Sequence, residues 1–123
     1  MIINLTQHKA TPQQIAAGVI ESQPESKRSI KALLLFEELP SKEEIQHRAS
    51  ALAAIAFSHK ASSAMIGGAP YLMSELEKSL AKEGIKAVYS FSERVSEEVM
   101  DHETGEVRKV NKFSHIGFVD AVN

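Results

Sequence analysis

The chain has 123 residues, of which 43% are hydrophobic and 24% are charged, a composition typical of one soluble globular domain. Its net charge of −2 supplies no basic field, which argues against binding of long nucleic acid as the main role. The absence of cysteine excludes disulfides, thiolate zinc sites and cysteine nucleophiles, and no apolar run approaches the roughly 20 residues that span a bilayer. We therefore expect one cytoplasmic domain over residues 1–123, with no signal peptide and no membrane contact.

The N-terminal segment predicts a strand followed by a short helix. "MIINLTQH" opens with a β-branched apolar run, which is typical of a strand over residues 1–6. Thr11 and Gln14 have the spacing of a capping box, and Pro12 suits the first turn of a helix. Gly18 is expected to end that helix.

Two further helices are expected before the middle of the chain. Residues 22–36 favour a helix over a brief buried strand. Residues 41–59 predict a longer helix, because Ser41 and Glu44 have capping-box spacing and the apolar residues that follow fall on one face. Its alanine-rich composition also favours helix.

A strand, a helix and a strand then follow in order. "SSAMIGG" predicts a buried strand that ends in two glycines, "APYLMSELEKSLAKEG" predicts a helix, and "IKAVYSFS" predicts a third strand. This spacing is that of a βαβ unit, which implies parallel strands joined by a right-handed crossover.

The last third of the chain predicts an antiparallel hairpin around the turn sequence "HETG". The flanking segments carry opposite charges, with Glu97 and Glu98 on the first and Arg108, Lys109 and Lys112 on the second. Cross-strand pairing of these charges would support the hairpin. The predicted fold is therefore α/β: a three-layer Rossmann-like domain with a small parallel sheet core and a C-terminal antiparallel β-hairpin.

The carboxyl ends of the predicted parallel strands carry the candidate site, because ligands of open parallel sheets bind where those ends meet. The first strand leads to His8 and the second to the glycine pair, while the third ends among serines. We expect His8 to be the catalytic residue. The expected ligand-binding residues are Thr11, Gly67, Gly68, Ser90, Ser92 and Arg94.

The glycine pair has two interpretations. Gly67 and Gly68 precede a helix, so their backbone amides could hold a phosphate or carboxylate group at the positive end of that helix. "GGAP" matches neither the P-loop nor the G-x-G-x-x-G pattern, however, and two glycines after a strand also make an ordinary turn.

The other candidates also keep a structural alternative. Histidine exchanges protons near neutral pH, which suits His8 to acid–base chemistry, but the ring could instead hold its own loop. Arg94 could bind phosphate in a bidentate fork or pair with a neighbouring glutamate. Ser90 and Ser92 could donate to a ligand or face solvent.

The sequence around His115 favours a structural role for this residue. Strict alternation in "FSHIGFV" puts Phe113, His115 and Gly117 on one face, and Ser114, Ile116 and Phe118 on the other. The histidines of the chain lack H-x-x-x-H spacing, so we expect no metal site and no cofactor. The absence of G-x-S-x-G argues against a serine hydrolase of the common α/β kind.

Three stretches, "NLTQHKATPQQIAAGV", "AMIGGAPYLM" and "FSHIGFV", resemble a family of small uncharacterised proteins of phages, prophages and their bacterial hosts. The order of elements, with His8 and Ala10 beside the first strand, also resembles the small Rossmann-like accessory proteins of CRISPR systems, which bind or cleave cyclic oligonucleotides. This second resemblance implies a homodimer whose loops surround a nucleotide messenger.

We predict that the protein binds a phosphate-bearing small molecule, such as a cyclic nucleotide signal. An enzymatic version would cleave a phosphodiester without a metal, by aligning a ribose 2′-hydroxyl with the phosphorus. The alternative is a non-catalytic accessory protein that sequesters a messenger or binds a host or defence-system protein. A third possibility is a protein adaptor that uses the charged hairpin.

Overall fold

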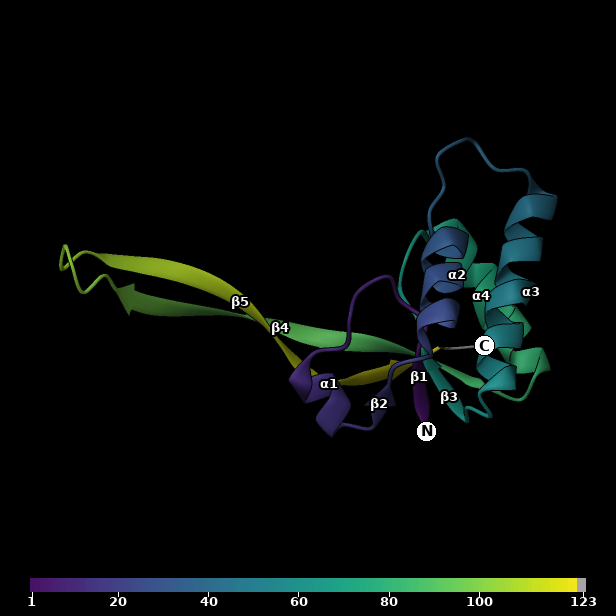
Figure 1. Ribbon diagram of the computed structural model, residues 1–123, viewed down its shortest axis with the longest axis horizontal. Coiled ribbons are helices and arrows are strands. Elements are labelled where there is room, and N and C mark those ends of the chain that lie inside the picture. The colour runs from purple at the N-terminus through teal and green to yellow at the C-terminus, as the bar shows by residue number, and fades with distance from the viewer. Residues whose placement is uncertain (122–123) are drawn as a thin grey trace.

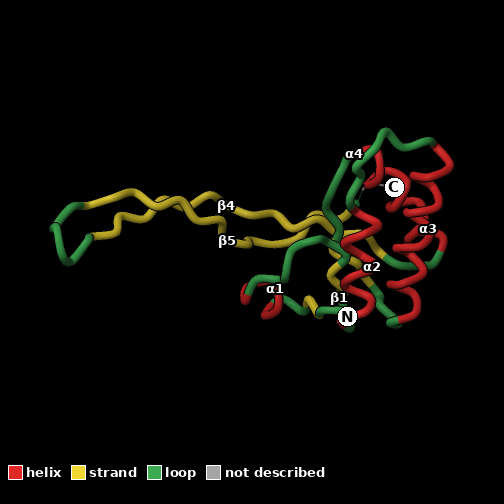
Figure 2. Tube along the Cα trace, turned by 45° about the horizontal axis from the view of Figure 1, so that its top comes forward, coloured by secondary structure: helices red, strands yellow, loops and turns green. Residues whose placement is uncertain are grey.

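The computed structural model describes residues 1–121, which form four helices and five strands (Figure 1). In chain order these are β1 (Ile2–Asn4), α1 (Pro12–Ala16), β2 (Val19–Ile20), α2 (Pro24–Leu34), α3 (Lys42–Ser58), β3 (Ser63–Met65), α4 (Pro70–Lys82), β4 (Lys86–Met100) and β5 (Val107–Asp120). Figure 2 shows that the helices gather with the short strands in a compact body, while β4 and β5 continue beyond it.

The strands form one sheet in the order β2-β1-β3-β4-β5. The first four strands are parallel, and β5 runs antiparallel to β4. The expected mixed α/β fold and the antiparallel pairing at the C-terminus are thus confirmed. Each connection between consecutive parallel strands contains at least one helix, which is the usual form of the long crossover that parallel pairing requires.

Side chains of the short strands alternate between two apolar clusters. On one face, Ala64 and Ile66 pack with the buried leucines of α3 and α4. On the other face, Met65 and Val88 pack with Val19, and the short helix α1 lies near this side, next to β2 and β5. Burial of each large side chain contributes about 1.5–3 kcal/mol, so the first cluster provides most of the stability. Its fully buried leucines are Leu5, Leu52, Leu72, Leu76 and Leu80.

The helix starts follow the predicted capping chemistry. Thr11 and Gln14 form the complete capping box of α1, as expected. Ser41 Oγ accepts a hydrogen bond from the backbone N–H of Glu44 at 3.1 Å, so this helix start is confirmed as well. The second hydrogen bond of a capping box, from the Ser41 backbone N–H to the Glu44 side chain, is not formed. The Glu44 carboxylate instead accepts a hydrogen bond from Arg48 Nε at 2.7 Å.

Two strands differ from the prediction. β2 was not expected, because two residues after Gly18 are too short to show an alternating pattern. The predicted third strand and the first hairpin arm are one continuous strand, β4, of 15 residues. The prediction divided this strand at "SERVSEE", but that part of β4 is exposed and tolerates charge.

A β-bulge interrupts the pairing of β4 with β5. Phe91 pairs with Gly117, but the next residue, Ser92, pairs with His115, which leaves Ile116 as an extra residue. The prediction that His115 and Phe118 face opposite sides is therefore wrong. Their rings are in contact, with centroids 4.7 Å apart, because the extra residue reverses the alternation.

Beyond the bulge, β4 and β5 form an arm that projects from the body (Figures 1 and 2). We define the arm as residues 92–115. The predicted pairing of opposite charges is confirmed there by an ion pair of 2.9 Å between Lys112 Nζ and Glu97 Oε2. None of the helices in residues 1–121 is both long enough and apolar enough to cross a membrane.

Candidate functional site

The strand order creates a natural binding position between β1 and β3. From β1 the chain passes to β2 on one side, and it later returns to β3 on the other side of β1. Where the order reverses in this way, the loops that follow the two strands diverge and leave a crevice outside their carboxyl ends. The loop after Asn4 and the loop after Met65 border this crevice.

A cavity of about 410 Å³ lies at this position. Its lining comes from segments that are distant in sequence: the loop after β1, the start of α1, the glycine turn after β3, and the first third of β4. Five of the expected site residues line it, namely His8, Thr11, Gly67, Gly68 and Ser90.

Ser92 and Arg94 do not line this cavity. Both are exposed on the arm, where Ser92 pairs with His115 and Arg94 with Phe113. The sequence prediction placed them at the end of a strand, but β4 continues past the bulge and carries them away from the body.

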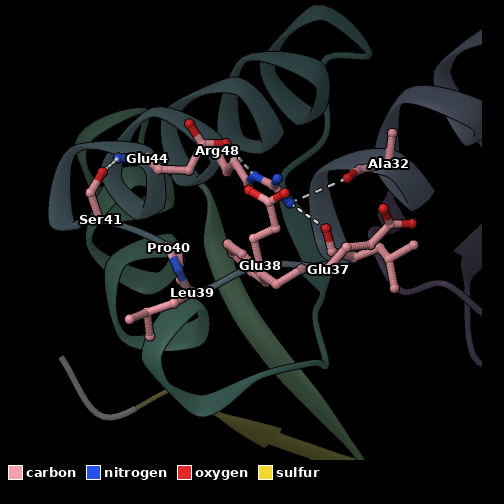
Figure 3. A pocket seen from close by; sticks show the side chains of 10 residues that line it. Ala32, Glu37, Glu38, Leu39, Pro40, Ser41, Glu44 and Arg48 are labelled. Atoms are coloured by element: carbon pink, nitrogen blue, oxygen red, sulfur yellow. Dashed lines mark hydrogen bonds and ion pairs between the residues drawn. The ribbon is translucent and has the colours of Figure 1, made fainter.

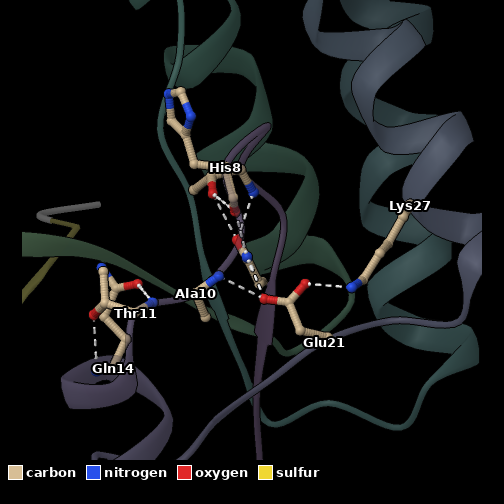
Figure 4. A network of polar contacts seen from close by, with 8 residues as sticks. His8, Ala10, Thr11, Gln14, Glu21 and Lys27 are labelled. Atoms are coloured by element: carbon tan, nitrogen blue, oxygen red, sulfur yellow. Dashed lines mark hydrogen bonds and ion pairs between the residues drawn. The ribbon is translucent and has the colours of Figure 1, made fainter.

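A buried asparagine holds the loop that carries His8 (Figure 4). Asn4 Nδ2 donates hydrogen bonds to the His8 carbonyl oxygen and to Glu21 Oε1, both at 2.8 Å. Asn4 Oδ1 accepts from the backbone N–H of Thr6 at 2.9 Å and from its hydroxyl at 2.7 Å. The side chain therefore uses three hydrogen bonds to shape the loop through Thr6 and His8, and a fourth to connect it to Glu21.

Glu21 connects this loop to β2 and α2. Its Oε1 also accepts from the backbone N–H of Ala10 at 2.8 Å, and its Oε2 lies 3.0 Å from Lys27 Nζ. Burial by itself would raise the pKa of Glu21, but the hydrogen bonds from Asn4, Ala10 and Lys27 and the charge of Lys27 together lower it. The ionised form is thus the one that the fold stabilises.

We expect Glu21→Gln to reduce the free energy of unfolding by about 1 kcal/mol at pH 7, because glutamine keeps an acceptor but loses the charge that faces Lys27. A lowered pKa in the folded state stabilises the protein above the ordinary value of 4.5, and this contribution is lost as the pH falls through the folded value. The difference between the two proteins in urea unfolding should therefore shrink on acidification. Glu83→Gln, at the exposed end of α4, is the control, because it removes one carboxylate outside this network.

The glycine turn, which lines the cavity, has unpaired backbone donors. The N–H groups of Gly67, Gly68 and Ala69 make no hydrogen bond to another residue in the described range 1–121. Ala69 is the N-cap of α4, and no side chain caps this helix end. Gly68 has a φ of +155°, a conformation that other residues rarely adopt. These groups are available to an anion at the positive end of α4.

Positive side chains border the same region. Lys9 lines the 410 Å³ cavity and also an adjoining cavity of about 190 Å³, which Lys31 lines as well. Neither lysine pairs with an acidic group among residues 1–121.

In Figure 4 the His8 ring points away from the Asn4 network, so the loop is held by the His8 carbonyl oxygen and not by its imidazole.

Two partnerships on the β4 side were not anticipated from the sequence. Ser90 Oγ accepts a hydrogen bond from Gln14 Nε2 at 3.1 Å and lies 2.7 Å from His115 Nδ1. The Tyr89 hydroxyl donates to Glu77 Oε2 at 2.5 Å, and burial together with this carboxylate raises the pKa of Tyr89. These contacts join residues 12 to 76 positions apart in the chain, a separation that no local pattern reveals.

A larger cavity of about 630 Å³ lies between α2 and α3 (Figure 3). Its charged lining consists of Glu37, Glu38 and Glu44 with a single cation, Arg48. The Arg48 guanidinium is already engaged by Glu44 and lies 4.2 Å from the centroid of the Phe36 ring. The acidic lining would repel a phosphate, so this cavity is a poor candidate for the predicted ligand despite its size.

No group of three or more histidine, aspartate or glutamate side chains within residues 1–121 is placed to hold a metal ion.

A family model described as the uncharacterized protein MJ1673 family matches residues 1–119 of the chain. No curated protein and no solved structure matches it. The family description mentions neither phages nor CRISPR systems, so both resemblances stay predictions.

Proposed function

The chain belongs to the uncharacterized MJ1673 family, and we propose that it binds a phosphate-bearing small molecule, a cyclic nucleotide signal above all, in the cavity between β1 and β3. The observation that carries this proposal is the convergence of His8, Thr11, the glycine turn and Ser90 on that one cavity. In this proposal the sheet is a three-layer Rossmann-like core, with α1 on one face and α2–α4 on the other, and the protein acts in the cytoplasm.

The chemistry of the cavity favours an anion over a neutral ligand. The amides of Gly67 and Gly68 lack partners among residues 1–121, and Lys9 adds an exposed positive charge. The rest of the lining, including Thr11 and Ser90, offers hydroxyl groups suited to the oxygens of a sugar phosphate.

The catalytic version of the proposal is metal-independent cleavage of a phosphodiester. The cavity would align a ribose 2′-hydroxyl with the phosphorus, and His8 would move the proton. Arg94 was the expected partner of the developing charge, but it lies on the arm. The Gly67 and Gly68 amides and Lys9 take that role in the present proposal, because they line the cavity.

The test is incubation of the protein with a panel of cyclic mono-, di- and oligonucleotides, read by chromatography and by calorimetric titration. Cleavage that His8→Ala abolishes without loss of binding would support the enzyme. Binding with full recovery of intact ligand would support a protein that sequesters a messenger. His102→Ala, in the exposed turn of the arm, is the matched control. A panel that neither binds nor changes would contradict the proposal.

A second candidate, an accessory protein that binds a defence-system protein, is favoured by the arm. Phe113 is 73% exposed, and Met100 and Val107 are exposed on the same face. An isolated two-stranded hairpin is only marginally stable in water, so a partner would stabilise it. Charge reversal at the basic residues of β5 should abolish partner capture and leave nucleotide binding unchanged; these residues are Arg108, Lys109 and Lys112.

A further inference from the structure

Ser90, which lines the cavity, forms a hydroxyl–imidazole pair with His115, which does not line it. Ser90 lines the cavity, and its Oγ lies 2.7 Å from His115 Nδ1. Both residues are half-buried, which limits competition from water. A hydroxyl within hydrogen-bond reach of an imidazole nitrogen is the arrangement in which a serine becomes a nucleophile.

The position of Gln14 orients this pair. Gln14 Oε1 accepts from the backbone N–H of Thr11 at 3.0 Å within the capping box, so the other end of the amide is Nε2. Gln14 Nε2 donates to Ser90 Oγ at 3.1 Å. With its ring proton on Nε2, His115 accepts the Ser90 hydroxyl proton at Nδ1. The Ser90 hydroxyl then accepts one hydrogen bond, from Gln14, and donates one, to His115.

The β-bulge places His115 on the face of the sheet that carries Ser90 and Phe118. Without the extra residue Ile116, strict alternation would separate His115 from the face of Phe118. The imidazole instead packs against the Phe118 ring at a centroid distance of 4.7 Å, and Phe118 belongs to the cluster of Val88 and Met65. The base is therefore held by packing on one side and by Ser90 on the other.

We propose that Ser90 is a nucleophile, that His115 is its general base, and that the cavity hydrolyses a phosphate ester through a phosphoserine intermediate. Ser90 Oγ forms a bond to phosphorus while the bond from phosphorus to the leaving oxygen breaks. The Ser90 proton passes to His115 Nδ1 and then to the leaving oxygen. Water next attacks phosphorus, the bond to Ser90 Oγ breaks, and a water proton returns through His115 to Ser90.

This assignment rests on the proposed phosphate-ester ligand, but it replaces the ribose 2′-hydroxyl with a group of the protein, so the ligand need not be a ribonucleotide. Gly67 and Gly68 line the same cavity, and their unpaired amides would stabilise the charge that develops on phosphorus. Ser92 provides a natural comparison, because it is exposed on the same strand outside the cavity.

The experiment uses diisopropyl fluorophosphate, an organophosphorus electrophile without a nucleoside, on the full chain. We expect one adduct per chain, located at Ser90 by peptide mass spectrometry, with release of fluoride. Ser90→Ala should give no adduct, and Ser92→Ala should react as the original protein does. His115→Phe keeps a ring against Phe118 but removes the base, so labelling should slow by about 100-fold or more.

An adduct on a residue other than Ser90, or equal labelling rates for the original protein and a folded His115→Phe, would overturn the assignment. The nucleotide panel separates this result from the proposed function. An adduct at Ser90 without nucleotide binding would support Ser90 as the nucleophile and contradict the proposal that the ligand is a nucleotide. Nucleotide binding without an adduct would contradict the assignment of Ser90 as a nucleophile and support the proposed binding function.

Discussion

At pH 7, Asn4→Asp is expected to reduce the free energy of unfolding by about 3–5 kcal/mol. The substitution preserves size and keeps the acceptor for Thr6, but it replaces a donor by an oxygen that faces two acceptors. Those acceptors, Glu21 Oε1 and the His8 carbonyl oxygen, each lie 2.8 Å from the Asn4 nitrogen. Because Asn4 is 4% exposed, water cannot screen the repulsion between the two carboxylates.

The pH dependence distinguishes this charge effect from simple loss of packing. Burial and the neighbouring Glu21 raise the folded pKa of the new carboxyl, so the deficit relative to the original protein should shrink as the pH falls and the carboxyl is protonated. Urea unfolding between pH 7 and pH 4 measures it. Asn111→Asp is the control, because Asn111 Oδ1 accepts from Ser96 on the exposed arm and aspartate keeps that acceptor. Equal deficits at Asn4 and Asn111 would show that the buried network is not formed.

Gly67→Asp is expected to weaken binding of an anionic nucleotide by about 100-fold or more without unfolding the protein. Gly67 does not have a positive φ, so its backbone accepts a side chain. A Cβ built there lies 3.6 Å from Thr6 Cγ2, an ordinary contact. The new carboxylate would stand at the rim of the cavity, where the amides of the turn would otherwise meet the phosphate.

The matched variant is Gly67→Asn, which has the same size and no charge. Calorimetric titration with a cyclic nucleotide should show a much smaller loss of affinity for this variant than for Gly67→Asp. Gly68 is unsuitable for this test, since its φ of +155° strains any other residue and a Cβ would lie 3.3 Å from Met73 Cε. If the aspartate and asparagine variants bind equally well, no anion is bound at the glycine turn.

Local chemistry explains which elements could be predicted. The starts of α1 and α3 follow from Thr11 and Ser41, because a capping hydrogen bond joins residues only three positions apart. The strand β3 and the helix α4 follow from an apolar run, two glycines and a proline. The strand β2 could not be predicted, since two residues form a strand only where a neighbouring strand, here β1, offers its backbone.

The sequence predicted the location of the candidate site better than it predicted the contacts within the site. The carboxyl-end rule indicated His8, the glycine turn and Ser90, which line one cavity. It also indicated Arg94, because nothing local reveals that β4 continues into an arm. A polar residue within the apolar run "IINL" was an available signal for Asn4, since buried polar side chains need partners.

By itself, then, the sequence determined the helices, the parallel centre and the terminal hairpin, because hydrophobic periodicity, capping and turn residues act over a few positions along the chain. Only the tertiary structure decided that Asn4 meets Glu21 and that Ser90 meets Gln14 and His115. Those contacts depend on strand order and on one extra residue in β5, and both are set by pairing and burial between segments that are distant in sequence.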